Sequence, residues 1–336
     1  MNGILYGNKL KTAGLIVGIL IALIIMVLSV VLGYTNTSLK QAIEAYTAFN
    51  GSNEHLIIQL SRVPRSLVGM AVGISLGIAG VLMQALTRNP IASPDIFGVN
   101  AGAGFFIVFG VTFLGVSSIQ QFMWIGFLGA AVAAGLAYAL GSAGQGGLTP
   151  VKLTLAGAVM AALFASLTQG MLVTNEKALD EVLFWLAGSV EGRKLSMLVA
   201  VLPALVIAWV ISLLLSRQLN AFALGEDVAI SLGQKTVVFK LAAALMVIIL
   251  AGGSVAIAGP ISFIGIVVPH FARYLVGNDH RWIVPYSAII GGIMLVVADI
   301  GARYIIMPEE APVGVVTALI GTPFFIYIVR KGIFQK

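Results

Sequence analysis

The sequence contains no cysteine, and only 10% of its 336 residues are charged. The absence of cysteine excludes disulfides, thiolate metal sites and cysteine nucleophiles. Soluble domains average about 25% charged residues, so this low charge content excludes an ordinary soluble domain. Hydrophobic residues make up 59% of the chain instead. These values predict an all-α polytopic membrane protein, folded as a single transmembrane domain over residues 1–336.

Catalytic and metal-binding motifs are scarce as well. The nearest approach to a phosphate-binding loop is LGQKT, in which Gln234 separates the glycine from the lysine. The three histidines, His55, His270 and His280, lack the spacing of metal ligands. We therefore expect no catalytic residue, no nucleotide site, no metal site and no cofactor, and the chain is not expected to be an enzyme.

Long intervals without charge mark the membrane spans, because a hydrocarbon core about 30 Å thick needs about 20 apolar residues per helix. Single spans lie between Lys11 and Lys40, Arg65 and Arg88, Lys152 and Glu176, Lys194 and Arg217, Arg281 and Asp299, and Glu310 and Arg330, with two spans within 96–151 and two within 240–273. Glycine and proline interrupt the last of these runs, so its second helix is expected to be short. The pattern predicts about ten transmembrane helices.

The distribution of basic residues predicts the orientation of these spans. An even number of spans places both chain ends on one side, and Lys and Arg favour the cytoplasmic side. With a cytoplasmic N-terminus, twelve of the 19 Lys and Arg residues lie inside and the other seven outside. Both termini are therefore expected in the cytoplasm. The net charge of +6 then reflects orientation, and no nucleic-acid partner is expected.

Two glycine-rich segments suggest an internal repeat. SLGIAGVLMQ, which begins at Ser75, resembles SVAIAGPISF, which begins at Ser254. The first lies in a helix expected to run inward and the second in a helix expected to run outward. Inverted repeats of this kind occur in many transporters. We expect the repeats to cover about residues 62–173 and 235–330, although close helix packing also uses glycine-rich segments.

Charged residues inside the spans are few. Asp299 is the only acid within an apolar run, and Arg303 follows it by four residues, so an ion pair near the interface is its simplest role. A transporter without buried ion-coupling groups or a nucleotide site is expected to take its energy from partner subunits. The alternative is an ion-coupled secondary transporter, and a membrane-embedded enzyme is a third class.

The segment LNAFALGEDVAISLG, from Leu219 to Gly233, is expected in the cytoplasm between the sixth and seventh spans. Its apolar residues recur three and four positions apart, which predicts one short amphipathic helix. A helix lying on lipid would favour Lys and Arg on its polar face, whereas this segment carries Glu226 and Asp227. A protein partner therefore fits the segment better than a lipid surface.

Four motifs in order resemble the permease subunits of binding-protein-dependent ABC importers for iron-siderophores, haem and vitamin B12. They are RVPRSLVGMAVGISLGIAGVLMQALTRNPIASPDIFGVNAGA from Arg62, LNAFALGEDVAISLG from Leu219, GPISFIGIVVPHFAR from Gly259 and PVGVVTALIGTPFFIYIV from Pro312. The resemblance implies a ten-helix subunit of a bacterial cytoplasmic membrane transporter that imports such a substrate. Its implied partners are two cytoplasmic ATPase subunits, an extracytoplasmic substrate-binding protein, a second permease subunit (a copy or a related chain) and membrane lipid.

The resemblance also implies roles for particular residues. The segment 219–233 matches the cytoplasmic coupling helix that sits in a cleft of the ATPase. Its coupling residues are Leu219, Asn220, Ala221, Leu224, Gly225, Glu226, Asp227, Ala229 and Gly233. On the outer side, Arg62, Arg65 and Arg303 match arginines that receive carboxylates of the binding protein, although Arg62 and Arg65 could instead anchor a helix end at lipid headgroups.

The segment TRNPIASPD, residues 87–95, is expected to form a turn because two prolines stop helices there and Asn and Ser bond local backbone. Gln84 and Asn100 flank this turn on apolar helix faces. They either line the translocation path or join neighbouring helices.

Overall fold

Long helices that run side by side make up the computed structural model, which describes residues 3–330 except 36, 144–148, 176–178, 180, 181, 184 and 308. No strand occurs among these described residues. The elements are α1 Gly7–Val31, α2 Leu39–Thr47, α3 Asn53–Ile57, the π-helical turn η1 Ile58–Arg62, α4 Val63–Thr87, the 3-10 turn η2 Pro94–Phe97, α5 Val99–Leu114, α6 Ile119–Ser142, α7 Pro150–Thr174, α9 Leu195–Leu214, α10 Ser216–Ala223, α11 Glu226–Ser231, α12 Thr236–Ala258, α13 Ile264–Val276, α14 His280–Ile305 and α15 Val313–Arg330.

Seven of the described helices are long and apolar enough to cross a membrane, namely α1, the continuous helix from α3 to α4, α6, α7, α9, α12 and α14. Three shorter apolar helices, α5, α13 and α15, accompany them. At 1.5 Å per residue, the 13 residues of α13 extend only about 20 Å, less than the hydrocarbon thickness. The all-α membrane fold is confirmed, whereas the count of ten spans and the inverted repeat remain predictions.

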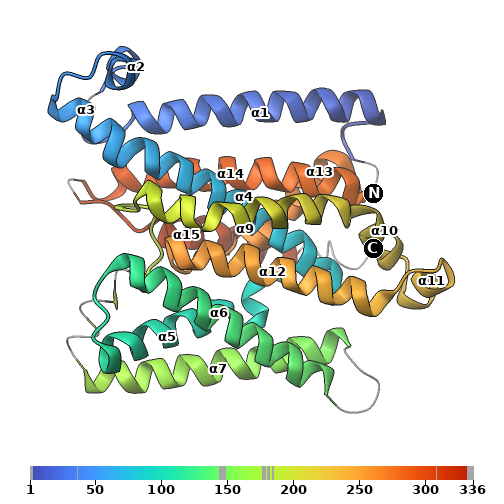
Figure 1. Cartoon of the computed structure of the whole chain (residues 1–336). Coiled ribbons are helices and arrows are strands. Elements are labelled where there is room, and N and C mark those ends of the chain that lie inside the picture. Colours follow the sequence, from blue (N-terminus) through green and yellow to red (C-terminus); the bar gives the residue numbers. More distant parts are fainter. Residues whose placement is uncertain are drawn as a thin grey trace.

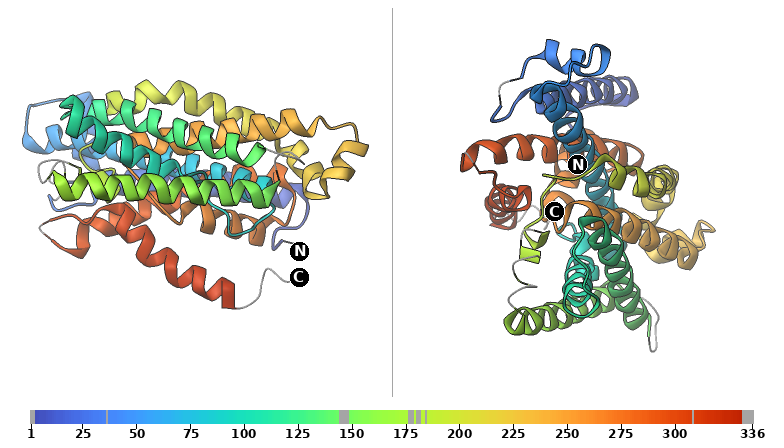
Figure 2. Two further views of the ribbon diagram at one scale, coloured as in Figure 1. Left: turned by 90° about the horizontal axis from the view of Figure 1, so that it is seen from below. Right: turned by 60° about the vertical axis from the view of Figure 1, so that its left-hand side comes forward.

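The beginning of α1 and the end of α15 lie at the same end of the bundle as α10 and α11 (Figures 1 and 2). The helices α2 and α3 lie at the opposite end. Following the charge bias, we call the end with α2 and α3 the outer end and the end with α10 and α11 the inner end. The shared position of the two chain ends agrees with the predicted topology.

Helix α4 forms the centre of the bundle, and its span is 89% buried, whereas the span of α1 is 6% buried. Glycines allow α4 to approach its neighbours closely. A Cβ added at Gly73 would lie 2.3 Å from the carbonyl oxygen of Gly291 on α14, and one at Gly80 would lie 2.1 Å from that of Gly265 on α13. Small residues at such crossings allow backbones to pack closely in membranes. Within the described chain α4 is therefore the core, and α1 is the most exposed of the long spans.

The predicted turn after α4 is present. Arg88 ends α4 in the left-handed region with φ of 49°, and Pro94 begins η2. The side chain of Asn89 accepts a hydrogen bond of 3.1 Å from the backbone amide of Ile91. This local bonding follows from the preference of Asn for turns. The turn thus leads the chain back into the bundle, where α5 begins.

Candidate functional site

Two short helices, α10 and α11, occupy the region in which the sequence predicts one helix over residues 219–233. The break falls at Gly225, whose φ of 129° and ψ of 148° are not helical. Gly233 follows α11 with φ of 80°. Residues with a Cβ rarely adopt these angles, so the two glycines define the angular path of the segment. Gly225 therefore divides the predicted helix in two, and Gly233 ends its second part.

Helix α10 is anchored in the bundle by its buried side chains. Leu219 is fully buried, and the ring of Phe222 packs 5.2 Å from that of Phe239 on α12. The guanidinium of Arg88 lies 4.7 Å from the centroid of the Phe222 ring. Such cation–π contacts add to the burial of the aromatic ring. The inner end of α4 and the beginning of α12 are therefore joined through α10.

Asn220 connects α10 to the beginning of α14. Its side-chain amide donates a 2.7 Å hydrogen bond to Asp279, and its carbonyl oxygen accepts one of 2.8 Å from the backbone amide of His280. Partial burial alone would raise the pKa of Asp279, but hydrogen bonds from Arg281 and Asn220 outweigh it and lower that pKa to about 2. The sequence-predicted coupling residue Asn220 thus has a structural role within the chain.

The acids of α11 differ in their surroundings. Glu226 forms an ion pair with Lys240 on α12, with 2.5 Å between Oε1 and Nζ, whereas Asp227 is exposed. Ala221 is half-buried, and Ala229 is fully buried. Of these four predicted coupling residues, only Asp227 is therefore exposed to a partner in this conformation.

Exposed apolar side chains gather on α11 and the turns beside it. Leu224 is 69% exposed and Leu232 is 67% exposed, and Val228 and Ile230 are also exposed. We call these four residues the inner apolar surface. Figure 1 shows that α11 projects beyond the ends of the long helices. An exposed apolar surface on an anchored, projecting element is typical of a protein interaction site. Sequence periodicity found Leu224, Val228 and Leu232 and missed Ile230.

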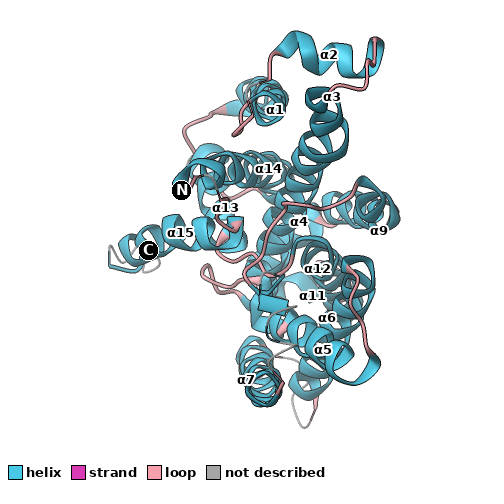
Figure 3. Cartoon of the chain, turned by 90° about the vertical axis from the view of Figure 1, so that its left-hand side faces the viewer, coloured by secondary structure: helices cyan, strands magenta, loops and turns pink. Residues whose placement is uncertain are grey.

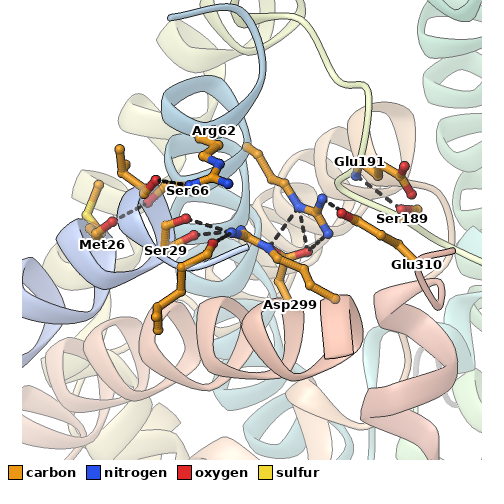
Figure 4. A network of polar contacts seen from close by, with 12 residues as sticks. Met26, Ser29, Arg62, Ser66, Ser189, Glu191, Asp299 and Glu310 are labelled. Carbon is orange, nitrogen blue, oxygen red and sulfur yellow. Dashed lines mark hydrogen bonds and ion pairs between the residues drawn. The ribbon is translucent and has the colours of Figure 1, made fainter. Parts of the chain in front are cut away.

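The outer end contains a buried network of charged residues. Arg65 on α4 donates hydrogen bonds of 2.9 Å from Nε and 2.7 Å from Nη2 to Asp299 on α14, and it also pairs with Glu310. Arg303 donates a bond of 2.6 Å to the other oxygen of Asp299. The arginines and Asp299 are each 6% exposed or less. Figure 4 shows Asp299 and Glu310 within this network.

Two of the three predicted docking arginines, Arg62 and Arg303, hold the outer end of α1. Arg303 donates to the carbonyl oxygens of Ser29 and Leu32 at 2.6 and 2.7 Å. Arg62 donates to those of Val30 and Val31 at 3.0 and 2.8 Å. The last carbonyls of a helix lack partners within the helix, so these guanidinium groups satisfy them. The predicted docking arginines are thus engaged inside the chain in this conformation, and both docking and headgroup anchoring remain predictions.

Both candidate path residues form side-chain hydrogen bonds within the chain in this conformation. Gln84 accepts a 2.6 Å hydrogen bond from Arg273 on α13 and donates to the carbonyl oxygens of Gly265 and Ile266 at 3.3 Å. Asn100 donates a hydrogen bond to Asp95 in η2. Of the two roles that the sequence left open, the contacts of Gln84 favour joining helices, whereas the Asn100 bond is local to the turn that precedes α5.

Open space lies beside α15 instead. A cavity of about 620 Å³ is lined by the segments 186–187 and 260–262 and by α15. A second cavity, of about 600 Å³, is lined by Pro323, Ile326, Tyr327 and Arg330 further along α15. Figures 2 and 3 show α15 standing apart from most of the bundle. Sequence reasoning missed this region because its side chains are mostly apolar and carry no motif of a binding site.

The helical membrane architecture, the projecting inner apolar surface and the open cavities define a transport permease. The chain belongs to the FecCD transport family, whose model matches residues 20–331. This match confirms the resemblance inferred from the motifs and gives no support to an ion-coupled secondary transporter. The chain is a multi-pass protein of the cytoplasmic membrane and a permease subunit rather than an enzyme.

Its relatives include "Probable siderophore transport system permease protein YfiZ" from Bacillus subtilis (strain 168), which is 61% identical over 304 residues and covers 90% of this chain and 91% of the relative. "Ferric enterobactin transport system permease protein FepD" from Escherichia coli (strain K12) is 44% identical and covers 94% of each chain. A solved structure titled "An inward-facing conformation of a putative metal-chelate type ABC transporter" has a TM-score of 0.83 and 28% identity, covering 96% of this chain and 99% of that one.

Proposed function

We propose that this chain forms half of the translocation path of an ABC importer that carries an iron-siderophore inward. The 61% identity to a relative named as a siderophore permease supports this cargo. Haem or a corrinoid is a second cargo class, because a relative named as a cobalamin import permease, from Halobacterium salinarum (strain ATCC 700922 / JCM 11081 / NRC-1), is 36% identical. ATP hydrolysis takes place in separate subunits under this proposal.

The inner apolar surface is the observation that carries the proposal. Leu224, Val228, Ile230 and Leu232 project from the inner end, where a cytoplasmic ATPase would bind. The Asn220–Asp279 hydrogen bond links the segment to α14, and the Glu226–Lys240 ion pair links it to α12. Movement of an ATPase bound here would therefore displace both of these long helices. Two ATPase subunits would serve a pair of permeases, either two copies of this chain or this chain and a related one.

Docking of an extracytoplasmic binding protein is proposed for the outer end. Arg62, Arg65, Arg303 and Glu310 line a cavity of about 100 Å³ there. A carboxylate of the binding protein that entered this cavity would meet three guanidinium groups. Charge complementarity of this kind favours encounter and correct register more than affinity alone.

The cavities beside α15 are proposed as this chain's share of the cargo path. Ser262 and Thr322 are the hydroxyl-bearing residues that line the larger cavity, and its other lining residues are apolar or glycine. Gln84 supports the path indirectly, by fixing where α13 lies beside α4, and Asn100 does so by bonding to the turn that leads into α5.

The test replaces single residues of the inner apolar surface. Leu224→Glu and Leu232→Glu are each expected to weaken ATPase binding about tenfold, or ~1.4 kcal/mol, because interface anchors of this size contribute more than 1 kcal/mol. Gln218→Glu, which adds the same charge at an exposed position of α10, is the matched control.

The measurements are ATPase co-purification and cargo uptake by proteoliposomes that contain the whole complex. Uptake is assayed with a panel of ferric siderophores, haem and cobalamin. Wild-type ATPase binding by both leucine variants would contradict the coupling role of the surface. Uptake driven by an ion gradient without ATP would contradict the importer function.

A further inference from the structure

Helix α2 lies at the rim of the outer end. In Figure 1, α2 is seen along its axis while α1 extends lengthwise, and Figure 3 shows the reverse, so α2 runs crosswise to α1. Figure 3 also shows α2 further from the centre of the bundle than α1 and α3. If α1 crosses the bilayer, α2 therefore lies along the membrane surface, beside the bundle rather than over it.

The short helix α2 is specified by its own sequence. Ser38 and Gln41 form a capping box, in which the Ser38 hydroxyl accepts from the backbone amide of Gln41 and the Gln41 side chain accepts from that of Ser38. Such reciprocal caps satisfy two amides that a helix start leaves unpaired. Lys40 and Glu44 add an ion pair of 3.5 Å one turn apart.

Three sides of α2 have different surroundings. The first side faces the protein, where Ala45 is fully buried and its carbonyl oxygen accepts a hydrogen bond from Gln59 of η1. The second side is apolar yet uncovered, since Leu39, Ile43 and Tyr46 are 54%, 57% and 59% exposed. The third side carries Lys40, Glu44 and Thr47. At 100° per residue, the apolar and the polar triplet each span an arc of about 60° and lie about 100° apart.

We propose that α2 is an interfacial helix whose apolar side, formed by Leu39, Ile43 and Tyr46, rests on the outer leaflet of the lipid bilayer. The three sides of α2 then face the protein, the lipid and water, which suits a helix lying in the interface plane. Tyr46 suits this depth because tyrosine is enriched where hydrocarbon meets water.

The surrounding surface supports lipid as the occupant. Helix α1, which contacts α2 at its outer end, exposes Leu20, Leu23, Ile24 and Leu28 along its length. Under this proposal α1 faces lipid, and the apolar side of α2 extends its exposed apolar surface at the membrane boundary. A binding protein centred on the bundle would lie away from the rim that α2 occupies. Lys40 is the only basic residue of α2 and is paired with Glu44, so the contact does not depend on anionic lipid.

Interfacial α2 would set the depth of the loop between α1 and α4. The same loop leads into η1, where Arg62 binds the outer end of α1. The lipid contact and the Arg62 contacts then restrain one segment from two directions. This inference is independent of the cargo and of the ATPase.

The absence of cysteine makes the test specific, because an introduced cysteine is the only thiol of the chain. Tyr46→Cys and Thr47→Cys place an environment-sensitive NBD fluorophore on the apolar and the polar side of α2. Both positions are exposed, and as consecutive residues of one helix they lie about 100° apart around its axis. The labelled full-length permease is studied in nanodiscs of zwitterionic lipid, after wild-type thermal melting of both variants has been verified.

The label at position 46 is expected to emit at shorter wavelength, to resist aqueous iodide and to lose fluorescence to nitroxide-bearing lipids. The label at position 47 is expected to be quenched by iodide, and added anionic lipid should leave both labels unchanged. Equal emission and equal iodide quenching at the two positions would overturn the proposal. Iodide protection of position 46 that appears only after the binding protein is added would assign the surface to that protein instead.

Discussion

Asp299 holds two buried arginines, and its neutralisation is the sharpest test of the outer network. In Asp299→Asn the shape of the side chain is retained while the negative charge is lost. One carboxylate oxygen becomes an NH2 group, which meets guanidinium donors that lie 2.6 to 2.9 Å from the oxygens in the wild type. The new amide donor and the guanidinium donor that faces it would both lack an acceptor, and buried unpaired donors lower the free energy of unfolding.

The expected cost follows from burial. Removing one partner of a buried ion pair destabilises a protein by about 3–5 kcal/mol, because the remaining charge is left without compensation. Glu310 still pairs with Arg65, and Arg303 keeps the carbonyls of Ser29 and Leu32. The lower end of the range, about 3 kcal/mol, is therefore expected. With a shift of about 2–4 °C per kcal/mol, the melting temperature should fall by roughly 6–12 °C.

The assay is thermal melting of the permease in nanodiscs, followed by the loss of the monodisperse size-exclusion peak. Glu44→Gln is the control, since it removes a charge from an exposed 3.5 Å ion pair that is worth about 0–1 kcal/mol. Melting of Asp299→Asn within about 1 °C of the wild type would refute the reasoning that the network stabilises the outer end.

Two further predictions concern packing and pH. Gly291→Ala places a Cβ 2.3 Å from the Gly73 carbonyl oxygen and should destabilise the protein by about 1–3 kcal/mol through overpacking. The control, Gly301→Ala on the same helix, meets no atom within 4 Å and should melt at or above the wild-type temperature. Equal melting temperatures of the two variants would contradict the close α4–α14 crossing. Because the pKa of Asp279 is lowered from 3.8 to about 2, its stabilisation is present above about pH 4 and is lost as the pH falls through 2. The melting temperature should therefore depend less on pH across this range in Asp279→Asn than in the wild type. The amide oxygen of this variant still accepts a hydrogen bond from Asn220. An unchanged dependence of the melting temperature on pH would exclude Asp279 as a source of acid sensitivity.

Composition and local order in the sequence determined the class of this protein. Charge-free intervals identify membrane helices because the bilayer tolerates few charges, so the assignment needs no knowledge of packing. The motifs from Arg62 and Leu219 also identified the family without knowledge of packing, because each is a contiguous run of residues. The position of the segment 219–233 outside the spans, and its turns at Gly225 and Gly233, could also be predicted from local chemistry.

Contacts between distant helices were decided only by the tertiary structure. Arg65 and Asp299 are 234 residues apart, and nothing in either neighbourhood specifies the other as a partner. Within α11 and its turns, Ala229 is buried while Leu224 is exposed, which reverses the order that their hydrophobicity suggests.

The physical reason is the solvent. In a bilayer, the lipid-facing and core-facing sides of a helix are both apolar, so hydrophobic periodicity does not tell them apart. On α12, Leu250 is fully buried and Leu245 is 52% exposed, although the residue type is the same. Which leucine meets protein and which meets lipid depends on the shape of the neighbouring helices, and that shape arises only when the whole bundle packs.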